Sequence, residues 1–175
     1  MNIIGLTGYQ SSGKDTAAEV LAEQGFLHIS TSDLIRKEMT ALGMPIDRDH
    51  IREFATKKRL ERGAGYLTEQ ASLMATEKTV ISGLRNVEEV EILRKKFGAD
   101  FRLVLVDAPL ETRYKWALAR NRETDHITFE QFVEQQQKER ASASQQIDAV
   151  IALADKTIVN DGALEDLQKK VVELI

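Results

Sequence analysis

The sequence contains no cysteine, only two prolines and a single tryptophan. Without cysteine the chain can form neither a disulfide bond nor a thiolate metal site, so nothing in it requires an oxidising compartment. The three histidines, His28, His50 and His126, are too widely spaced to indicate a zinc site. These absences exclude disulfide-stapled scaffolds and metal centres built on cysteine or histidine.

Long apolar runs are also missing. No stretch approaches the roughly 20 residues needed to cross a bilayer, and no basic segment precedes an apolar core at the N-terminus. We therefore expect a cytoplasmic protein that does not contact membranes. The net charge of -4 disfavours general nucleic-acid binding, because that function requires a basic surface to displace counterions from phosphates.

The 175 residues are 42% hydrophobic and 30% charged. A chain of this length can bury one well-packed core but is too short for two comfortable ones. We expect a single domain over residues 1–175, without an internal repeat or a linker. The composition leaves the oligomeric state open.

The most informative stretch is Gly8-Tyr9-Gln10-Ser11-Ser12-Gly13-Lys14-Asp15-Thr16, which follows an apolar run and opens an alanine-rich helical segment. A glycine, four further residues and then glycine-lysine are typical of a phosphate-binding loop. The glycines allow close approach of the backbone, the N–H groups face the phosphates, and the helix offers its positive end. Lys14 is expected to reach the β- and γ-phosphates of a nucleotide.

The residue after the lysine departs from the usual pattern, which has serine or threonine there. This chain has Asp15, followed by Thr16. Because Mg²⁺ prefers oxygen ligands, Asp15, Thr16 and Asp107, which ends a later strand, are candidate metal-binding residues. A favourable charge in the first helical turn is the other role open to Asp15, and a turn-forming role is open to Asp107.

Five apolar segments alternate with helical patterns. The expected strands are Ile3–Leu6, Phe26–Ile29, Thr79–Gly83, Phe101–Val106 and Lys156–Val159. Because parallel strands need crossovers and the crossovers here are helical, the pattern predicts an α/β fold with a five-stranded parallel sheet covered by helices on both faces. Ligands bind such sheets at the carboxyl ends of the strands, where Lys14, Asp33, Arg85 and Asp107 fall.

Three of the helical patterns lie between the second and third expected strands or after the fourth. The segment from Asp47 to Arg62 is mostly charged with a thin apolar stripe, which predicts a helix partly clear of the core. Further helices are expected over Tyr66–Glu77 and Glu111–Arg122. On the last of these, Tyr114 and Trp116 are expected to pack within the protein and not to stack on a base.

Four segments besides the loop resemble a known group of enzymes. They are Thr31–Arg36, Ile81–Arg85, Arg120–Arg122 and Ile158–Gly162. The first resembles the acceptor-site motif Thr-Gly-Asp-Leu-Leu-Arg of adenylate kinases, and the second is similar to their Asp-Gly-Phe-Pro-Arg, with Ser82 replacing the aspartate. The closing segment is closer to dephospho-CoA kinases. Together they resemble the nucleoside monophosphate kinase and dephospho-CoA kinase group of P-loop kinases, with archaeal-type predicted nucleotide kinases as the closest overall resemblance.

The resemblance implies a three-layer P-loop NTPase fold with a small acceptor-binding helical insertion at about residues 31–78 and a lid at about 113–128. It implies a phosphotransferase that uses ATP and Mg²⁺ and acts on small molecules, moving the γ-phosphoryl group to a phosphorylated acceptor, foremost a (deoxy)nucleoside monophosphate. A dephospho-CoA kinase and an ATP-binding regulatory protein are the alternatives. A nucleotide hydrolase is a further one, because Leu103–Asp107 is an apolar run ending in an aspartate.

The same resemblance assigns residue roles. The catalytic residues would be Lys14, Asp33, Arg120 and Arg122. The ATP-binding residues would be Gly8, Ser11, Ser12, Gly13, Lys14, Asp15, Thr16, Arg113 and Asn160. The acceptor would be held by Asp33, Arg36, Arg59 and Arg85. Arginine suits such places because its planar fork binds phosphate oxygens in pairs, although most surface arginines form only weak ion pairs.

Overall fold

The computed structural model describes residues 1–120, 127–141 and 146–175 of the chain. Its sheet has five strands in the order β2-β3-β1-β4-β5, and each adjacent pair is parallel. The strands are β1 (Asn2–Thr7), β2 (Leu27–Ser30), β3 (Lys78–Ser82), β4 (Phe101–Asp107) and β5 (Lys156–Val159). The predicted α/β fold with a five-stranded parallel sheet is confirmed.

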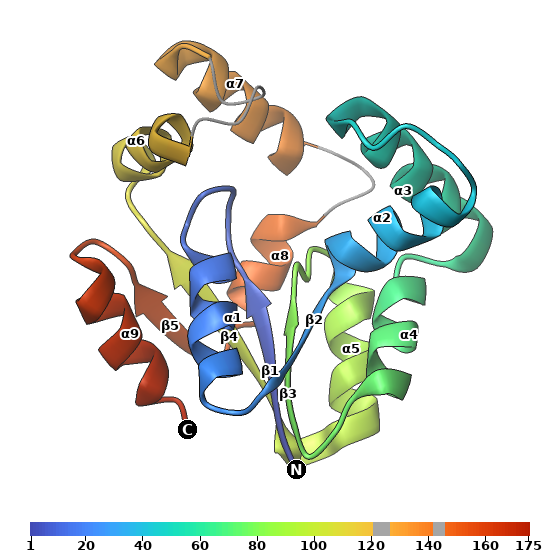
Figure 1. Ribbon diagram of the computed structural model, residues 1–175, viewed down its shortest axis with the longest axis vertical. Helices are drawn as coiled ribbons and strands as arrows, with labels where there is room; N and C mark the ends of the chain where they lie inside the picture. The colour runs from blue at the N-terminus through green and yellow to red at the C-terminus, as the bar shows by residue number, and fades with distance from the viewer. Residues whose placement is uncertain (121–126, 142–145) are drawn as a thin grey trace.

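Helices cover both faces of this sheet. They are α1 (Lys14–Glu23), α2 (Thr31–Ala41), α3 (Arg48–Arg62), α4 (Tyr66–Met74), α5 (Val87–Phe97), α6 (Leu110–Arg120), α7 (Phe129–Arg140), α8 (Ile147–Ala152) and α9 (Leu164–Val172), with a 3₁₀ turn at Gly98–Asp100. Figure 1 shows α1 and α9 together on one side and α4 and α5 on the other, and α8 belongs to the second side because its Val150 packs in the same cluster as Val90 of α5. Within the described part of the chain, no helix is both long and apolar enough to span a membrane.

The core lies in two apolar layers, one on each face of the sheet. Ile4 and Leu6 of β1 pack with α1 and α9, whereas Ile3 packs with α4, α5 and α8. Neighbouring strand residues point to opposite faces, so a strand that is covered on both faces must be apolar at nearly every position. This is why β1 and β4 appear in the sequence as continuous apolar runs.

Two helical groups stand at the carboxyl end of the strands, on either side of the loop that follows β1 (Figure 1). In one, Met39 of α2, Phe54 of α3 and Leu67 of α4 share a small core. In the other, Tyr114 of α6 packs against Phe129 of α7, with ring centroids 5.3 Å apart. The expected packing role of Tyr114 is confirmed, and α3 packs on other helices of its group.

Some helix boundaries and one helix differ from the prediction. Helix α4 ends at Met74 and not at Glu77, because Ala75 is extended and the backbone N–H of Thr76 donates to Thr79 Oγ1 at 2.8 Å. Helix α6 begins at Leu110, one residue early. The sequence did not predict α8, whose six residues are too few for a clear helical period.

Candidate active site

The loop between β1 and α1, residues 8–13, lies at the carboxyl edge of the sheet and requires its two outer glycines. Gly8 has φ 147° and Gly13 has φ 93°, a region that residues with a side chain rarely adopt. A Cβ on Gly13 would lie 2.3 Å from Asn160 Nδ2. That amide donates to the carbonyl of Ser12 at 2.9 Å, so Asn160 supports the loop from the C-terminal end of β5. The loop is thus built by backbone conformation and one long-range hydrogen bond.

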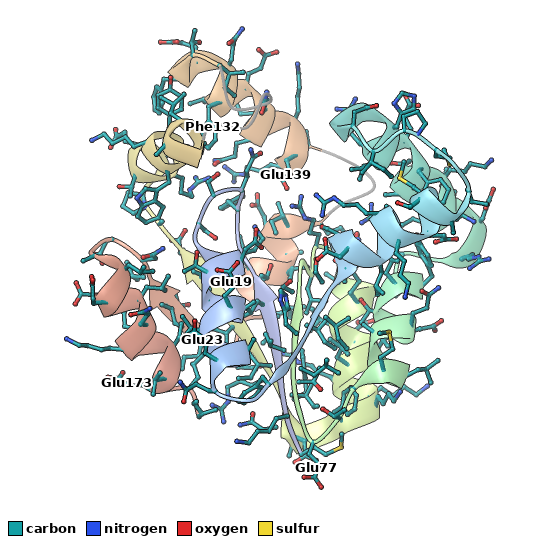
Figure 2. All side chains as sticks on the ribbon, viewed as in Figure 1. Glu19, Glu23, Glu77, Phe132, Glu139 and Glu173 are labelled. Atoms are coloured by element: carbon teal, nitrogen blue, oxygen red, sulfur yellow. The ribbon has the colours of Figure 1, made fainter. Side chains whose placement is uncertain are left out.

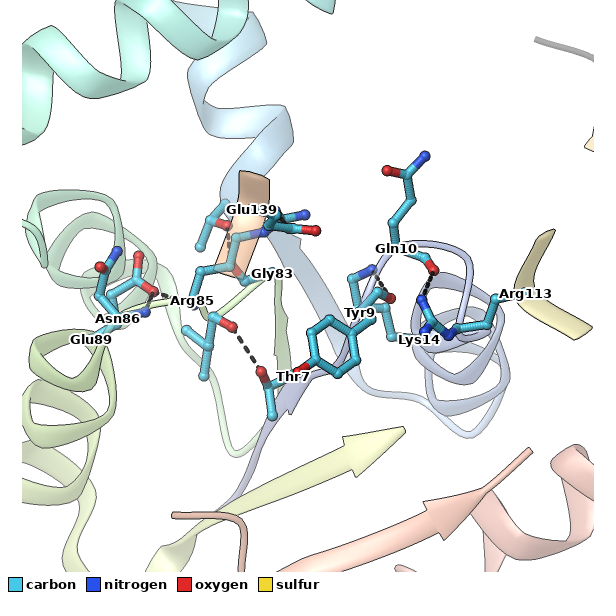
Figure 3. Close-up of polar contacts among 12 residues, drawn as sticks. Thr7, Tyr9, Gln10, Lys14, Gly83, Arg85, Asn86, Glu89, Arg113 and Glu139 are labelled. Atoms are coloured by element: carbon cyan, nitrogen blue, oxygen red, sulfur yellow. Dashed lines mark hydrogen bonds and ion pairs between the residues drawn. The ribbon is translucent and has the colours of Figure 1, made fainter. Parts of the chain in front are cut away.

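The polar groups of this loop suit an anion. The buried hydroxyls of Ser11 and Ser12 have no hydrogen-bond partner within the described structure. Ser11 is also the one non-glycine residue described with a positive φ, 60°, a strain that is common at functional sites. Lys14 is buried, and its ammonium lies 3.4 Å from the carbonyl oxygen of Tyr9 (Figure 3). Two hydroxyl donors, an ammonium and a helix N-terminus together provide what phosphate oxygens need.

A cavity of about 400 Å³ adjoins the loop and is called the P-loop cavity below. Its polar wall comes from the loop and α1, and its apolar wall from α6 and α9. The lining includes Ser11, Gly13, Lys14, Asp15, Thr16, Asn160, Trp116, Leu164 and Leu167. Apolar walls with a few convergent polar groups are typical of small-molecule sites. The sequence favoured internal packing for Trp116, whereas the structure places this half-buried side chain in the cavity wall.

The candidate metal ligands fall in different places. Asp15 and Thr16 line the P-loop cavity, whereas Asp107 does not and accepts a hydrogen bond from the N–H of Ala108 at 2.9 Å. Over residues 1–120, 127–141 and 146–175, no three acidic or histidine side chains gather to hold a metal ion. Mg²⁺ at nucleotide sites usually takes one or two protein oxygens and keeps phosphates and waters as its other ligands. The carboxylate of Asp15 and the hydroxyl of Thr16 therefore fit it.

Arg113 supports the loop through hydrogen bonds and does not line the P-loop cavity. Its side chain donates to the carbonyls of Ala108 at 3.0 Å and Gln10 at 3.3 Å, and to Gln136 Oε1 at 2.5 Å. The guanidinium is 4% exposed, and this burial lowers its pKa from the ordinary value. Arg113 thus ties the loop to α7, and its role in binding ATP stays a prediction.

A second loop, residues 83–86 after β3, is fastened to the same edge. Thr7 Oγ1 donates to the carbonyl of Leu84 at 2.9 Å, and Thr31 Oγ1 lies 3.2 Å from the carbonyls of Ser82 and Gly83. The hydroxyl of Ser82 itself is 2.8 Å from His28 Nε2. The backbone that carries Arg85 is therefore held on two sides. Figure 3 shows the side chain of Arg85 across from Lys14.

The arginines expected to bind the acceptor are each near a carboxylate. Arg36 Nη1 lies 2.7 Å from Asp33 Oδ1, in a pair whose side chains are 45% and 70% exposed. Arg85 pairs with Glu139, which lies towards the inner end of α7 in Figure 2. Arg59 is partly buried near the buried Glu89; burial lowers the pKa of its guanidinium, and the charge of Glu89 opposes that shift. The arginines that were expected to bind the acceptor thus each lie near a carboxylate of the protein itself.

Two catalytic candidates cannot be placed. Arg122 and the side chain of Arg120 lie outside the described residues. Their assignment to a lid over the donor phosphates stays a prediction.

The sequence did not indicate that Tyr9 of the first loop is linked by hydrogen bonds to α8 and, through Asp148, to α7. The Tyr9 hydroxyl donates to Asp148 Oδ1, and Arg140 Nε donates to Asp148 Oδ2 at 2.8 Å. Burial and the hydrogen bond to Asp148 raise the pKa of Tyr9 to about 12. The hydrogen bonds from Tyr9 and Arg140 lower the pKa of the Asp148 carboxyl. Because Tyr9 and Asp148 are 139 residues apart, no local pattern could reveal this contact.

Comparison with other sequences supplies the family. Residues 4–148 match the family described as "AAA domain". The chain is 31% identical to a UPF0200 protein of Thermococcus gammatolerans over 99% of this chain and 93% of that one. The chain belongs to the UPF0200 family. A UPF0200/UPF0201 protein of Archaeoglobus fulgidus is 30% identical over all of this chain, which spans 55% of the length of that relative.

Solved structures share the fold of this UPF0200 protein. TT1252 from Thermus thermophilus superposes with a TM-score of 0.62 at 22% identity, covering 99% of this chain and 95% of that one. A shikimate kinase from Aquifex aeolicus gives 0.57 at 17% identity, covering 98% and 94%. The protein therefore has a P-loop kinase-like fold over its whole described length.

Proposed function

We propose that this UPF0200 protein is an ATP-dependent phosphotransferase that moves the γ-phosphoryl group of ATP to a small phosphorylated acceptor, a (deoxy)nucleoside monophosphate. The observation that carries the proposal is the first loop. It offers the hydroxyls of Ser11 and Ser12 and the ammonium of Lys14 to an anion, beside a cavity large enough for a nucleoside. The shared fold with a shikimate kinase, itself a small-molecule kinase by name, supports this direction.

Phosphoryl transfer asks the protein to position two anions and to neutralise the moving charge. The acceptor oxygen attacks the γ-phosphorus, the bond to the β–γ bridging oxygen breaks, and ADP leaves. Lys14 stabilises the charge on the phosphoryl group, while the P-loop backbone holds the remaining phosphates. Asp15 and Thr16 would hold the Mg²⁺ that accompanies ATP, and the ion would supply positive charge to the phosphates.

The acceptor phosphate would bind at the loop after β3. Arg85 and Arg36 belong to segments that leave neighbouring strands, since β2 and β3 are adjacent and parallel. An acceptor phosphate has to replace the carboxylate of Glu139 on Arg85, whereas Asp33, on the same helix as Arg36, orients the Arg36 guanidinium. Phosphate is a good competitor, because arginine binds it through paired charge-assisted hydrogen bonds.

ADP formation tests the function. The rate is measured with ATP and Mg²⁺ alone and then with each ribo- and deoxynucleoside monophosphate and with dephospho-CoA. We expect slow turnover alone and a steep rise with at least one monophosphate. A rate that no acceptor changes would instead make the protein a hydrolase, and a rise with dephospho-CoA alone would assign the other kinase class.

A further inference from the structure

A second cavity, of about 1180 Å³, lies between α3, the first turn of α5 and the residue before α8. It shares no lining residue with the P-loop cavity, and we call it the α3 cavity. Arg52 and Arg59 of α3 line one side, and Asn86, Glu88 and Gln146 line the other. The α3 cavity therefore adjoins the loop that carries Arg85, because Asn86 is the next residue along the chain.

Two donors in this wall lack partners within the described structure. Asn86 is only 4% exposed, and its Nδ2 is buried with no hydrogen bond. Arg59 Nε is also buried without one. Buried polar groups are nearly always paired in folded proteins, so two orphaned donors lining one cavity point to a ligand that supplies acceptors.

The wall is held rigidly by Glu89, a carboxylate that is 1% exposed. It accepts hydrogen bonds from the N–H groups of Arg85 at 2.6 Å and Asn86 at 2.9 Å. The N–H of Gln146 also donates to the carbonyl of Arg85 at 2.8 Å. Figure 3 shows Asn86 and Glu89 on the side of Arg85 that faces away from Lys14. A phosphate on Arg85 would thus have the P-loop on one side and the α3 cavity on the other.

The charges in the α3 cavity favour a neutral group. Besides Arg52, Lys57 and Arg59, the wall carries the carboxylates of Glu53, Glu61, Glu88 and Glu91. A polyanion would be repelled by these carboxylates, whereas a heterocycle with both donor and acceptor edges can use groups of either sign.

We propose that the α3 cavity binds the nucleobase of the acceptor nucleoside monophosphate, with Asn86 Nδ2 and Arg59 Nε donating to acceptor atoms on the base. This inference rests on the proposed function and adds the subsite that would distinguish a nucleotide acceptor from a sugar phosphate. Arg85 holds the phosphate, and Glu89 is a positioning residue that fixes the backbone between phosphate and base.

The test compares a nucleoside monophosphate with ribose 5-phosphate, which carries the same 5′-phosphate but no base. KM is measured for the best nucleoside monophosphate, for ribose 5-phosphate and for ATP in two variants, Asn86→Ser and Arg59→Lys. Asn86→Ser removes the amide donor but keeps a residue that caps helices well, and Arg59→Lys keeps the charge. Arg62→Lys is the matched control, because Arg62 is an exposed residue of the same helix outside the α3 cavity.

We expect each variant to raise KM for the nucleoside monophosphate about tenfold, because each removes one good hydrogen bond from a buried group. KM for ATP and for ribose 5-phosphate should stay within about twofold of the wild-type values. Arg62→Lys should change nothing. Equal effects on both acceptors, or none, would overturn the inference while leaving the phosphotransferase in place.

Failure of the proposed function is recognised separately. If no acceptor is phosphorylated, the same ligands are titrated calorimetrically without ATP. Suppose the nucleoside monophosphate binds more tightly than ribose 5-phosphate, and Asn86→Ser and Arg59→Lys weaken that binding. The α3 cavity would then be a base-binding site in a protein that does not transfer the phosphoryl group. Absence of binding, or equal binding of ribose 5-phosphate, would overturn it.

Discussion

The two loops at the carboxyl edge of the sheet are built in different ways. The P-loop takes its shape from glycines with positive φ, from the amide of Asn160 and from the buried guanidinium of Arg113. The loop after β3 is equally well fastened, but Arg85 is paired with Glu139 of α7, and Arg36 is paired with Asp33 of its own helix. The P-loop thus presents donors to an anion directly, whereas a phosphate on Arg85 must replace the carboxylate of Glu139.

Substitutions can separate these two designs, and the largest effect is expected at Lys14. Lys14→Ala removes the charge placed on the moving phosphoryl group, so kcat should fall by about 10³-fold while the melting temperature stays close to that of the wild type. The check is steady-state ADP formation at saturating acceptor, with thermal melts to verify folding. Unchanged turnover would show that the loop is not the nucleotide site.

Asn160→Ala tests whether the P-loop depends on its long-range support. The substitution leaves the buried carbonyl of Ser12 without its donor, which should cost about 1–3 kcal/mol and raise KM for ATP about tenfold, with acceptor KM unchanged. Asp161→Ala, next to it on an exposed turn, is the control. Equal KM values for ATP in both variants would mean that the glycines alone shape the loop.

Asp33→Asn addresses the acceptor side and its chemistry. A nucleoside monophosphate attacks through a phosphate oxygen that is mostly ionised at neutral pH, with a second pKa of about 6, so it needs no general base. Loss of the exposed Asp33–Arg36 pair should then raise acceptor KM only about threefold and leave the acidic limb of the pH profile in place. Glu38→Gln, which disturbs another ion pair of α2, is the control.

A much larger effect of Asp33→Asn would change the acceptor class. Dephospho-CoA attacks through a sugar hydroxyl, and a carboxylate that takes its proton contributes about 10² to 10⁴ in rate. A kcat that falls by such a factor, with the acidic limb abolished, would establish a hydroxyl acceptor.

Glu139→Gln should release Arg85 from a competing carboxylate. We expect KM for the phosphorylated acceptor to decrease about threefold and KM for ATP to stay unchanged, since a partly exposed ion pair is worth little. Glu134→Gln, which disturbs the exposed Glu134–Lys138 pair of the same helix, serves as the control. A rise in KM for the phosphorylated acceptor in Glu139→Gln but not in Glu134→Gln would show that Glu139 orients Arg85 and does not compete with the acceptor for it.

The smallest effect concerns Tyr9, whose pKa is raised to about 12 from 10.0 by burial and Asp148. The folded protein holds this proton more tightly than the unfolded chain does. Its contribution to stability is therefore complete below about pH 10 and is lost as the pH rises to about 12.

Phenolate absorbance can follow this titration, with Tyr9→Phe subtracted to remove the other two tyrosines. Asp148→Asn should move the Tyr9 transition towards pH 10, because it removes the carboxylate that accepts the phenol proton. A transition that stays in place would assign the whole shift to burial.

The contrast between the loops also explains what the sequence could predict. The P-loop residues are contiguous and their glycines reflect backbone requirements, so the loop, the helix after it and the alternation of strands with helices follow from local pattern. Asn160 was included only through resemblance, although its amide holds the loop from 148 residues away.

The acceptor side could be predicted only in part. The segments with Arg36 and Arg85 were found and Asp33 was assigned with them, but Glu139, the partner of Arg85, could not be distinguished from a solvated surface charge. Trp116 looked like a packing residue and Asn86 was not singled out, because a cavity wall depends on which helices meet. Side chains that act through long-range assembly leave no periodic signal in the sequence.

We propose that the P-loop binds ATP and that the loop after β3 binds the acceptor to which the γ-phosphoryl group moves. The fate of the γ-phosphate tests this most directly. In a single turnover with γ-labelled ATP and the best monophosphate, we predict that the label appears in the acceptor in step with ADP, with little inorganic phosphate. Label found only in inorganic phosphate, at a rate that the acceptor does not change, would contradict the account.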